Sequence, residues 1–229
     1  MAVEGRDIQP RPEPKSSGCN VQLRLSQDFT ASAEAIPSPP HANYRSMQWE
    51  YRDPDERLEA AIEAFQQGRL EAARTELSEL LELGYHCTEV HLYLGHCALG
   101  EDRLGTALGH YREARRRGPD QAETYVGLAV VAARRLNFRR ATRLLHRAVT
   151  LDPRHQEAFD NLILTHAALG EVKESEEAFR CSLKIDSASP HPYFNAAFVQ
   201  FDRGEVAKAG ELWGKVLQVA PDYPDAERM

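Results

Sequence analysis

The sequence lacks the long apolar runs and paired cysteines that mark many classes of protein. No apolar run approaches the ~18 residues that a membrane-spanning helix needs, so we expect no membrane insertion. The N-terminus also has no apolar stretch of the kind found in secretory signals. The four cysteines are scattered without a CxxC pair, which favours reduced thiols and a cytoplasmic location.

The common catalytic and nucleotide-binding motifs are missing as well. The sequence contains no GxxxxGK[ST], GxGxxG, GxSxG or HExxH. One stretch is dense in possible metal ligands, namely His86-Cys87…His91…His96-Cys97. Its spacing is poor, because His91 and His96 lie about 140° apart around a helix axis. We therefore interpret these residues as packing residues, and we predict no metal, no cofactor and no enzymatic activity.

Residues 1–53 differ in composition from the remainder of the chain. Prolines recur there, and serine, alanine and glycine fill much of the space between them. Proline interrupts helices, and such a composition buries too little apolar surface to fold alone. We predict a disordered tail, interrupted by Pro10, Pro12, Pro14, Pro37, Pro39 and Pro40.

From residue 54 onward the sequence repeats itself with a period of 34 residues, without insertions. A shift of 34 superposes small residues, which allow two helix axes to approach closely. This column holds Ala73, Ala107, Ala141, Ser175 and Ala209.

The same shift superposes residues of a turn between two helices. Glycine is frequent in this column because it adopts the left-handed conformation that ends a helix. The column holds Gly68, Asp102, Leu136, Gly170 and Gly204.

Two further columns are mainly apolar and fill space between helices. In the first of these columns, a large residue follows the small residue of the same repeat by about one helical turn. The columns hold Leu77, Tyr111, Leu145, Phe179 and Trp213, and Ala60, Leu94, Leu128, Leu162 and Ala196.

A period of 34 with this pattern resembles the tetratricopeptide repeat, in which each unit is a helix–turn–helix. The resemblance implies an all-α, right-handed superhelical solenoid of five repeats, followed by a short tail at 224–229. The first and fourth repeats depart most from this pattern, because Arg57 replaces an aromatic in the first and serines replace two alanines and a proline in the fourth. The repeats would run 54–87, 88–121, 122–155, 156–189 and 190–223.

In this family the first helix of each repeat lines the concave surface. The resemblance therefore implies a scaffold or adaptor that binds an amphipathic helix or an extended apolar segment of another protein. The expected lining is mostly apolar: Leu58, Ile62, Phe65, Leu92, Tyr93, His96, Leu99, Val126, Val130, Asn161, Leu164, Phe194, Asn195, Phe198 and Phe201.

Two polar members of this lining bear on the kind of ligand. Asn161 and Asn195 stand where family members often use asparagine to bind the backbone of an extended peptide. The lysine and asparagine combination that clamps a C-terminal carboxylate is missing. A free C-terminus is therefore not the expected ligand.

Charge is unevenly distributed along the repeats. Residues 54–111 carry a net charge of −7, residues 112–154 of +7, and residues 155–229 of −6. The basic belt could bind nucleic acid, but no aromatic residues are interleaved with it and the chain as a whole is acidic. Pairing with nearby acids such as Glu174, Glu176 and Glu177, or with an acidic partner, fits better. The belt comprises Arg112, Arg115, Arg116, Arg117, Arg139, Arg140, Arg143 and Arg147.

Other functions remain open at this point. A chaperone-like carrier of a secreted or assembling client, or a regulatory subunit of an enzyme complex, would use the same surface. The last helix, expected near 205–219, carries apolar residues with no further repeat to cover them. We therefore also expect weak self-association through the C-terminal repeat.

Overall fold

The computed structural model describes residues 53–223. The predicted C-terminal tail at 224–229 lies outside this range, and so does the predicted N-terminal tail apart from Asp53. Everything below concerns the described residues, which all belong to one compact unit.

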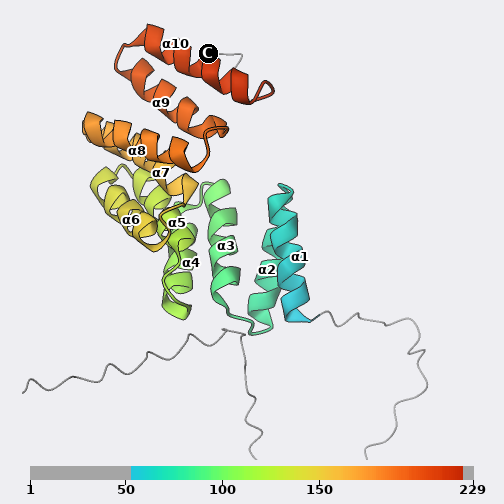
Figure 1. The fold of residues 1–229 in the computed structure, drawn as a ribbon. Helices are drawn as coiled ribbons and strands as arrows, with labels where there is room; N and C mark the ends of the chain where they lie inside the picture. The colour runs from blue at the N-terminus through green and yellow to red at the C-terminus, as the bar shows by residue number, and fades with distance from the viewer. Residues whose placement is uncertain (1–52, 224–229) are drawn as a thin grey trace, which may run out of the picture. The chain divides into compact units, whose positions relative to one another are not determined.

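Five helices begin 34 residues apart and form the first half of each repeat (Figure 1). In the first of them, the N-cap carboxylate of Asp53 accepts a hydrogen bond from the first turn, and proline at the first position suits this end of a helix. The five are α1 (Pro54–Gln66), α3 (Thr88–Gly100), α5 (Ala122–Arg134), α7 (Gln156–Ala168) and α9 (Pro190–Asp202).

Each is followed, after a short turn, by a second helix. The described residues contain helices and turns but no strand, so the predicted all-α solenoid is confirmed. In the fourth repeat, α8 has the same length as α6 and α10 and begins 34 residues from each of them. The serines of this repeat therefore leave the bounds of its second helix unchanged. The second helices are α2 (Leu70–Glu82), α4 (Leu104–Arg117), α6 (Phe138–Leu151), α8 (Val172–Ile185) and α10 (Val206–Val219).

Contacts between helices define an inner face. Each helix packs against its neighbours in sequence, and each first helix also touches the first helices of adjacent repeats. Among the helices described, no second helix touches another second helix. The first helices α1, α3, α5, α7 and α9 are therefore closer together and form the inner face, while the second helices form the outer face.

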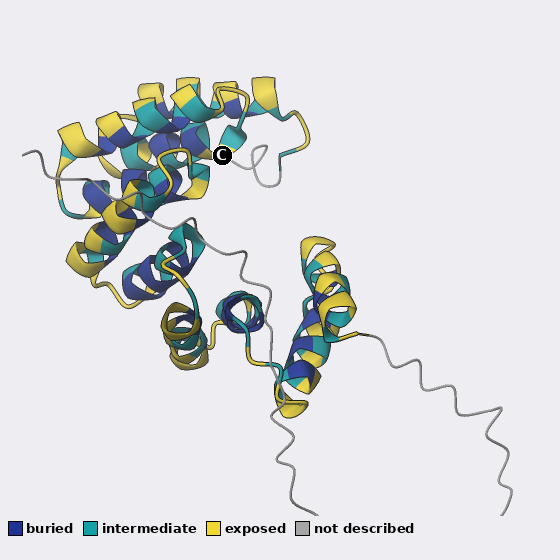
Figure 2. Ribbon diagram, turned by 60° about the horizontal axis from the view of Figure 1, so that its bottom comes forward, coloured by how far each residue is buried: buried dark blue, intermediate teal, exposed yellow. Residues whose placement is uncertain are grey.

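The columns found in the sequence form the core. The small-residue column is buried in all five repeats, and in Figure 2 the buried residues line the faces that neighbouring helices turn toward one another. Tyr111 is fully buried between α3 and α5. A Cβ atom added at Gly95 or Gly127 would lie 2.6 or 2.5 Å from its ring, so this tyrosine requires a glycine on both helices.

The turn column adopts the left-handed conformation in every repeat. Three of its members are glycines, and Asp102 has a φ of 58°. Leu136, with a φ of 59°, is the exception, because leucine has a Cβ and branches beyond it. The Leu136 side chain is 77% exposed, so its burial offsets little of the free energy that the left-handed conformation costs.

We predict that Leu136→Gly stabilises the protein. The left-handed conformation costs an L-residue roughly 1–2 kcal/mol, and a glycine costs about 0.5–1 kcal/mol in lost chain entropy. The free energy of unfolding, measured by urea denaturation, should rise by about 0.5–1 kcal/mol. Arg135→Gly is the control, since Arg135 has a φ of −91° and should lose stability. Equal losses in both variants would contradict this account.

Candidate functional site

The lining of the inner face is narrower than the sequence predicted. Leu58, Leu92 and Val126 were predicted to line it, but the structure buries all three in the core clusters, and Val126 is only 1% exposed. The fifth position of these repeats turns toward neighbouring helices rather than toward the open face. These three residues therefore stabilise the stack and are not available to a partner.

The other predicted lining residues keep some exposure. Phe198 and Phe201 are exposed, at 53% and 52%. The remainder are half-buried: Ile62, Phe65, Tyr93, His96, Leu99, Val130, Asn161, Leu164, Phe194 and Asn195.

The N-terminal half of the inner face carries a cluster of rings. The Phe65 ring lies 5.4 Å from that of Tyr93 and 5.7 Å from that of His96, measured between centroids. The His96 ring in turn lies edge-to-face with that of Tyr111 at 5.5 Å. These rings pack against one another, so little of their apolar surface is free for a partner.

A carboxylate with two histidine neighbours joins the second and third repeats. His155 Nδ1 accepts from the Ala158 N–H, so its Nε2–H donates to Glu123 Oε2 at 2.8 Å. His96 Nε2 lies 3.4 Å from Glu123 Oε1, and the Tyr111 hydroxyl lies 3.0 Å from His96 Nδ1. The hydrogen bond from His155, aided by His96, lowers the pKa of Glu123 to about 2, and the same bond raises the pKa of His155.

The C-terminal half of the inner face is hollowed. A hollow of about 280 Å³ lies between α7 and α9, beside the exposed ring of Phe198. Leu164, predicted as lining, forms part of its wall, together with Val172 and Val199. Asp202 and Arg203 also line it and are exposed. We call this the inner hollow.

Two of the three predicted phenylalanines of α9 are engaged within the fifth repeat. The Phe194 ring lies 5.5 Å from that of Tyr223, and the Phe201 ring lies 5.6 Å from that of Trp213 on α10. These two positions therefore contribute to packing within the repeat, although the sequence analysis assigned them to the lining of the inner face. Phe198 has no such ring contact in the described chain and is the freest of the three.

The asparagines already use one donor each. Asn161 donates to the Glu157 carbonyl oxygen and Asn195 to the Asp160 carbonyl oxygen, both at 3.0 Å. Each amide retains a second N–H and its oxygen, which are the groups that a peptide backbone would need.

The basic belt lies on the outer face, on α4 and α6, and all eight arginines are exposed. Arg116 pairs with Glu113 at 2.6 Å, and Arg147 pairs with Asp120 at 2.9 Å. The acids expected from the fourth repeat do not take part in these pairs, since Glu177 pairs with Arg180 on its own helix at 2.5 Å. Within the range 53–223, the belt is thus partly neutralised by acids that lie among its own arginines in the sequence.

Possible metal ligands in the described chain do not gather into a site. Residues 53–223 contain no group of three or more His, Cys, Asp or Glu side chains arranged to hold a metal ion. His91 is buried, and its Nδ1 lies 3.2 Å from Nδ1 of His110. Burial raises the pKa of the Cys87 and Cys97 thiols to about 11, which keeps both protonated. No helix in this part of the chain is both long and apolar enough to cross a bilayer.

Sequence reasoning missed two features of this site. Glu123 and His155 are 32 residues apart, and only the return of the chain at the end of each repeat brings them together. The walls of the inner hollow, Val172 and Val199, carry no signal of their own in the sequence.

The geometry defines a helical-repeat protein with an inner face built from the first helix of each repeat. The family model of the tetratricopeptide repeat matches residues 58–122 and 126–190, more than half of the chain. The chain belongs to the tetratricopeptide repeat family.

Several known proteins are similar to it. Over 137 residues, or 60% of this chain, it is 27% identical to tetratricopeptide repeat-containing protein trd-1 of Caenorhabditis elegans, and it spans only 18% of the length of that relative. The solved structure of TTC0263, a thermophilic tetratricopeptide repeat protein in Thermus thermophilus, is 21% identical with a TM-score of 0.68, covering 77% of this chain and 96% of that one. YrrB is 21% identical with a TM-score of 0.54, covering 77% and 91%. The two structures support the fold.

The Glu123 pair should make stability depend on pH. The depressed pKa of Glu123 contributes stability above about pH 4.5, which is lost as pH falls toward 2. The raised pKa of His155 contributes stability below pH 6.5, which is lost as pH rises through that pKa. After allowance for solvent screening, Glu123→Gln should therefore cost about 1 kcal/mol between pH 4.5 and 6.5, and less at pH 3 or pH 9.

Chemical denaturation at each pH provides the measurement. Glu89→Gln is the matched control, because Glu89 stands at the same position one repeat earlier and its neighbour Gln121 does not titrate. If the loss of unfolding free energy in Glu123→Gln does not vary with pH, the pKa values of Glu123 and His155 do not depend on each other.

Proposed function

We propose that this protein is a protein–protein interaction scaffold, not an enzyme, and that its inner face binds an apolar segment of a partner. The observation that carries the proposal is Phe198, 53% exposed beside an apolar hollow of about 280 Å³. A large apolar side chain exposed next to a concavity commonly marks a binding surface.

The two halves of the inner face would make different contributions. The rings and hydrogen bonds around His96 and Glu123 are satisfied internally, so they would position the partner more than attract it. The inner hollow would accept apolar side chains, and the free groups of Asn161 and Asn195 would bind backbone. An extended segment fits this combination better than a helix, since the polar groups of a helix backbone are already paired.

The expected affinity is modest. Each buried apolar anchor contributes roughly 1.5–3 kcal/mol, against about 4–15 kcal/mol lost on association. Four to six anchors would give a Kd of about 1 μM. YrrB is described as a tetratricopeptide repeat protein with an unusual peptide-binding site, which supports peptide binding by this fold. Carrier or accessory-subunit roles would use the same face and would differ in the partner's identity.

We predict that Phe198→Ser removes most of the partner binding while the fold is retained. A partner would be recovered by affinity purification and then titrated calorimetrically against both proteins. Loss of one anchor should weaken binding about 10-fold or more. Leu83→Ser is the control, because Leu83 is equally apolar and 66% exposed but lies in the turn after α2. Equal affinity of Phe198→Ser and wild type, with unchanged circular dichroism, would refute the inner hollow as the binding site.

We also propose weak self-association through α10. Val206 is 60% exposed and Val219 37%, whereas Val172 and Ile185, which precede them by 34 residues, are half-buried. Leu217 lies between them along the helix and is half-buried. Burial of one such side chain contributes about 2 kcal/mol, which suits a weak dimer.

Light scattering at rising concentration tests this second proposal. The mean mass should increase for wild type and for Gln218→Lys, an exposed control, but not for Leu217→Lys. A constant monomer mass, or an increase that Leu217→Lys does not change, would exclude this interface.

A further inference from the structure

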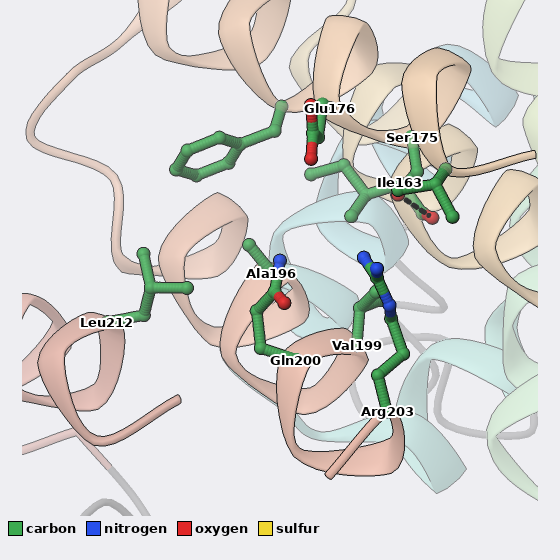
Figure 3. Close-up of a pocket in the computed structure, with 10 residues that line it drawn as sticks. Ile163, Ser175, Glu176, Ala196, Val199, Gln200, Arg203 and Leu212 are labelled. Atoms are coloured by element: carbon green, nitrogen blue, oxygen red, sulfur yellow. Dashed lines mark hydrogen bonds between the residues drawn. The ribbon is translucent and has the colours of Figure 1, made fainter. Parts of the chain in front are cut away.

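A second hollow, of about 180 Å³, lies at the junction of the fourth and fifth repeats (Figure 3). It is bounded by α7, α8, α9 and α10, and we call it the junction hollow. Its apolar lining consists of Ile163, Val172, Phe179, Ala196, Val199 and Leu212.

The junction hollow exists because one side chain of the repeat pattern is too small. In the three preceding repeats, the seventh position holds a leucine that packs against the preceding second helix. These leucines are buried, whereas the fifth repeat has Ala196 at the same position. Phe179, which faces this gap, is only half-buried, although its equivalents Tyr111 and Leu145 are fully buried. The gap therefore corresponds to the missing part of a leucine side chain and the space around it.

The floor of the junction hollow suits an apolar guest. Ser175 is the polar residue buried there, and its hydroxyl donates to the Ile163 carbonyl oxygen at 2.8 Å, as the dashed line in Figure 3 shows. Its hydrogen is therefore already used inside the protein. An enclosed apolar cavity of about 150 Å³ in another protein accepts benzene. The junction hollow has a similar volume but opens to solvent at its mouth.

The mouth is polar and carries opposite charges. Glu176 from α8 and Arg203 just after α9 approach from opposite sides, as Figure 3 shows. Both are exposed, and neither forms an ion pair with any residue in the described range. A carboxylate accepts hydrogen bonds and a guanidinium donates them, so together they match the N–H and C=O groups of a peptide chain.

We propose that the junction hollow binds one apolar side chain of a partner polypeptide, and that Glu176 and Arg203 hold the flanking peptide groups. The site is separate from the inner hollow, although the two share Val172, Val199 and Arg203 as walls. It does not depend on Phe198, which lines only the inner hollow. The proposal rests on the proposed role in binding polypeptides, but a Phe198 variant changes the inner hollow without changing a residue that lines the junction hollow.

Titration of the full chain, followed by ¹H–¹⁵N NMR, tests the apolar part with benzene as the ligand. Benzene should cause saturable shifts at residues around Ala196. Ala196→Leu fills the space and should weaken benzene binding ~10-fold or more, while raising the Tm by a few degrees. Ala207→Leu is the matched control, since Ala207 is exposed on α10 and should leave binding unchanged.

A second ligand, N-acetyl-phenylalaninamide, tests the polar mouth, because it adds two peptide groups to the ring. It should bind more tightly than benzene. Glu176→Gln and Arg203→Gln should each weaken it about 3- to 10-fold while leaving benzene binding unchanged. Equal affinity for the two ligands, or no effect of either variant, would overturn the assignment of a polypeptide ligand.

The apolar part has its own contrary outcomes. Absence of saturable shifts near Ala196, or full benzene binding by Ala196→Leu, would overturn the site. If Ala196→Leu does not fold, Ala196→Val provides a smaller filling of the same space, and it should still weaken benzene binding. Phe198→Ser should bind benzene as wild type does, which separates this result from the test of the inner hollow.

Discussion

The close approach of helices at one small residue per repeat is the contact on which the rest of the structure depends. Ala73, Ala107 and Ala141 have no exposed surface at all, and Ser175 and Ala209 continue their column. Because a larger side chain there would push two helices apart, this column fixes how closely each second helix packs against its neighbours. That spacing in turn determines which side chains of the inner face meet and which remain open. The same tight spacing leaves room for a buried tyrosine between α3 and α5 only because glycines stand beside it.

The junction of the fourth and fifth repeats is held partly by hydrogen bonds. The Ser182 hydroxyl donates to the buried Asp160 carboxylate at 2.6 Å, and the Asn195 amide donates to the Asp160 carbonyl oxygen. Burial raises the pKa of Asp160, because the charged form is poorly solvated there. The bond from Asn195 ties α9 to α7 even though Ala196 leaves the apolar contact incomplete. An incomplete contact can therefore persist as a hollow instead of collapsing.

The sequence was sufficient to predict the helical pairs, because every repeat supplies the same small, apolar and turn residues at the same spacing. Leu136 stands in the turn column and has the left-handed conformation that this column predicts, although it is not a glycine. The inner face was harder to predict, because the twist of the stack decides whether a position such as Val126 faces outward or inward. The junction hollow depends on how far neighbours relax around Ala196, which no pattern of residue types reveals.

The division of the inner face suggests how stability and binding are reconciled. A surface that binds must leave apolar groups unsatisfied, whereas a stable stack must satisfy them. Here the first three repeats satisfy their rings and charges internally, through His96, Glu123 and His155. The fourth and fifth repeats leave Phe198 exposed and two hollows open. A partner bound there would complete the packing that the repeats begin, so its binding would also stabilise the C-terminal end of the stack.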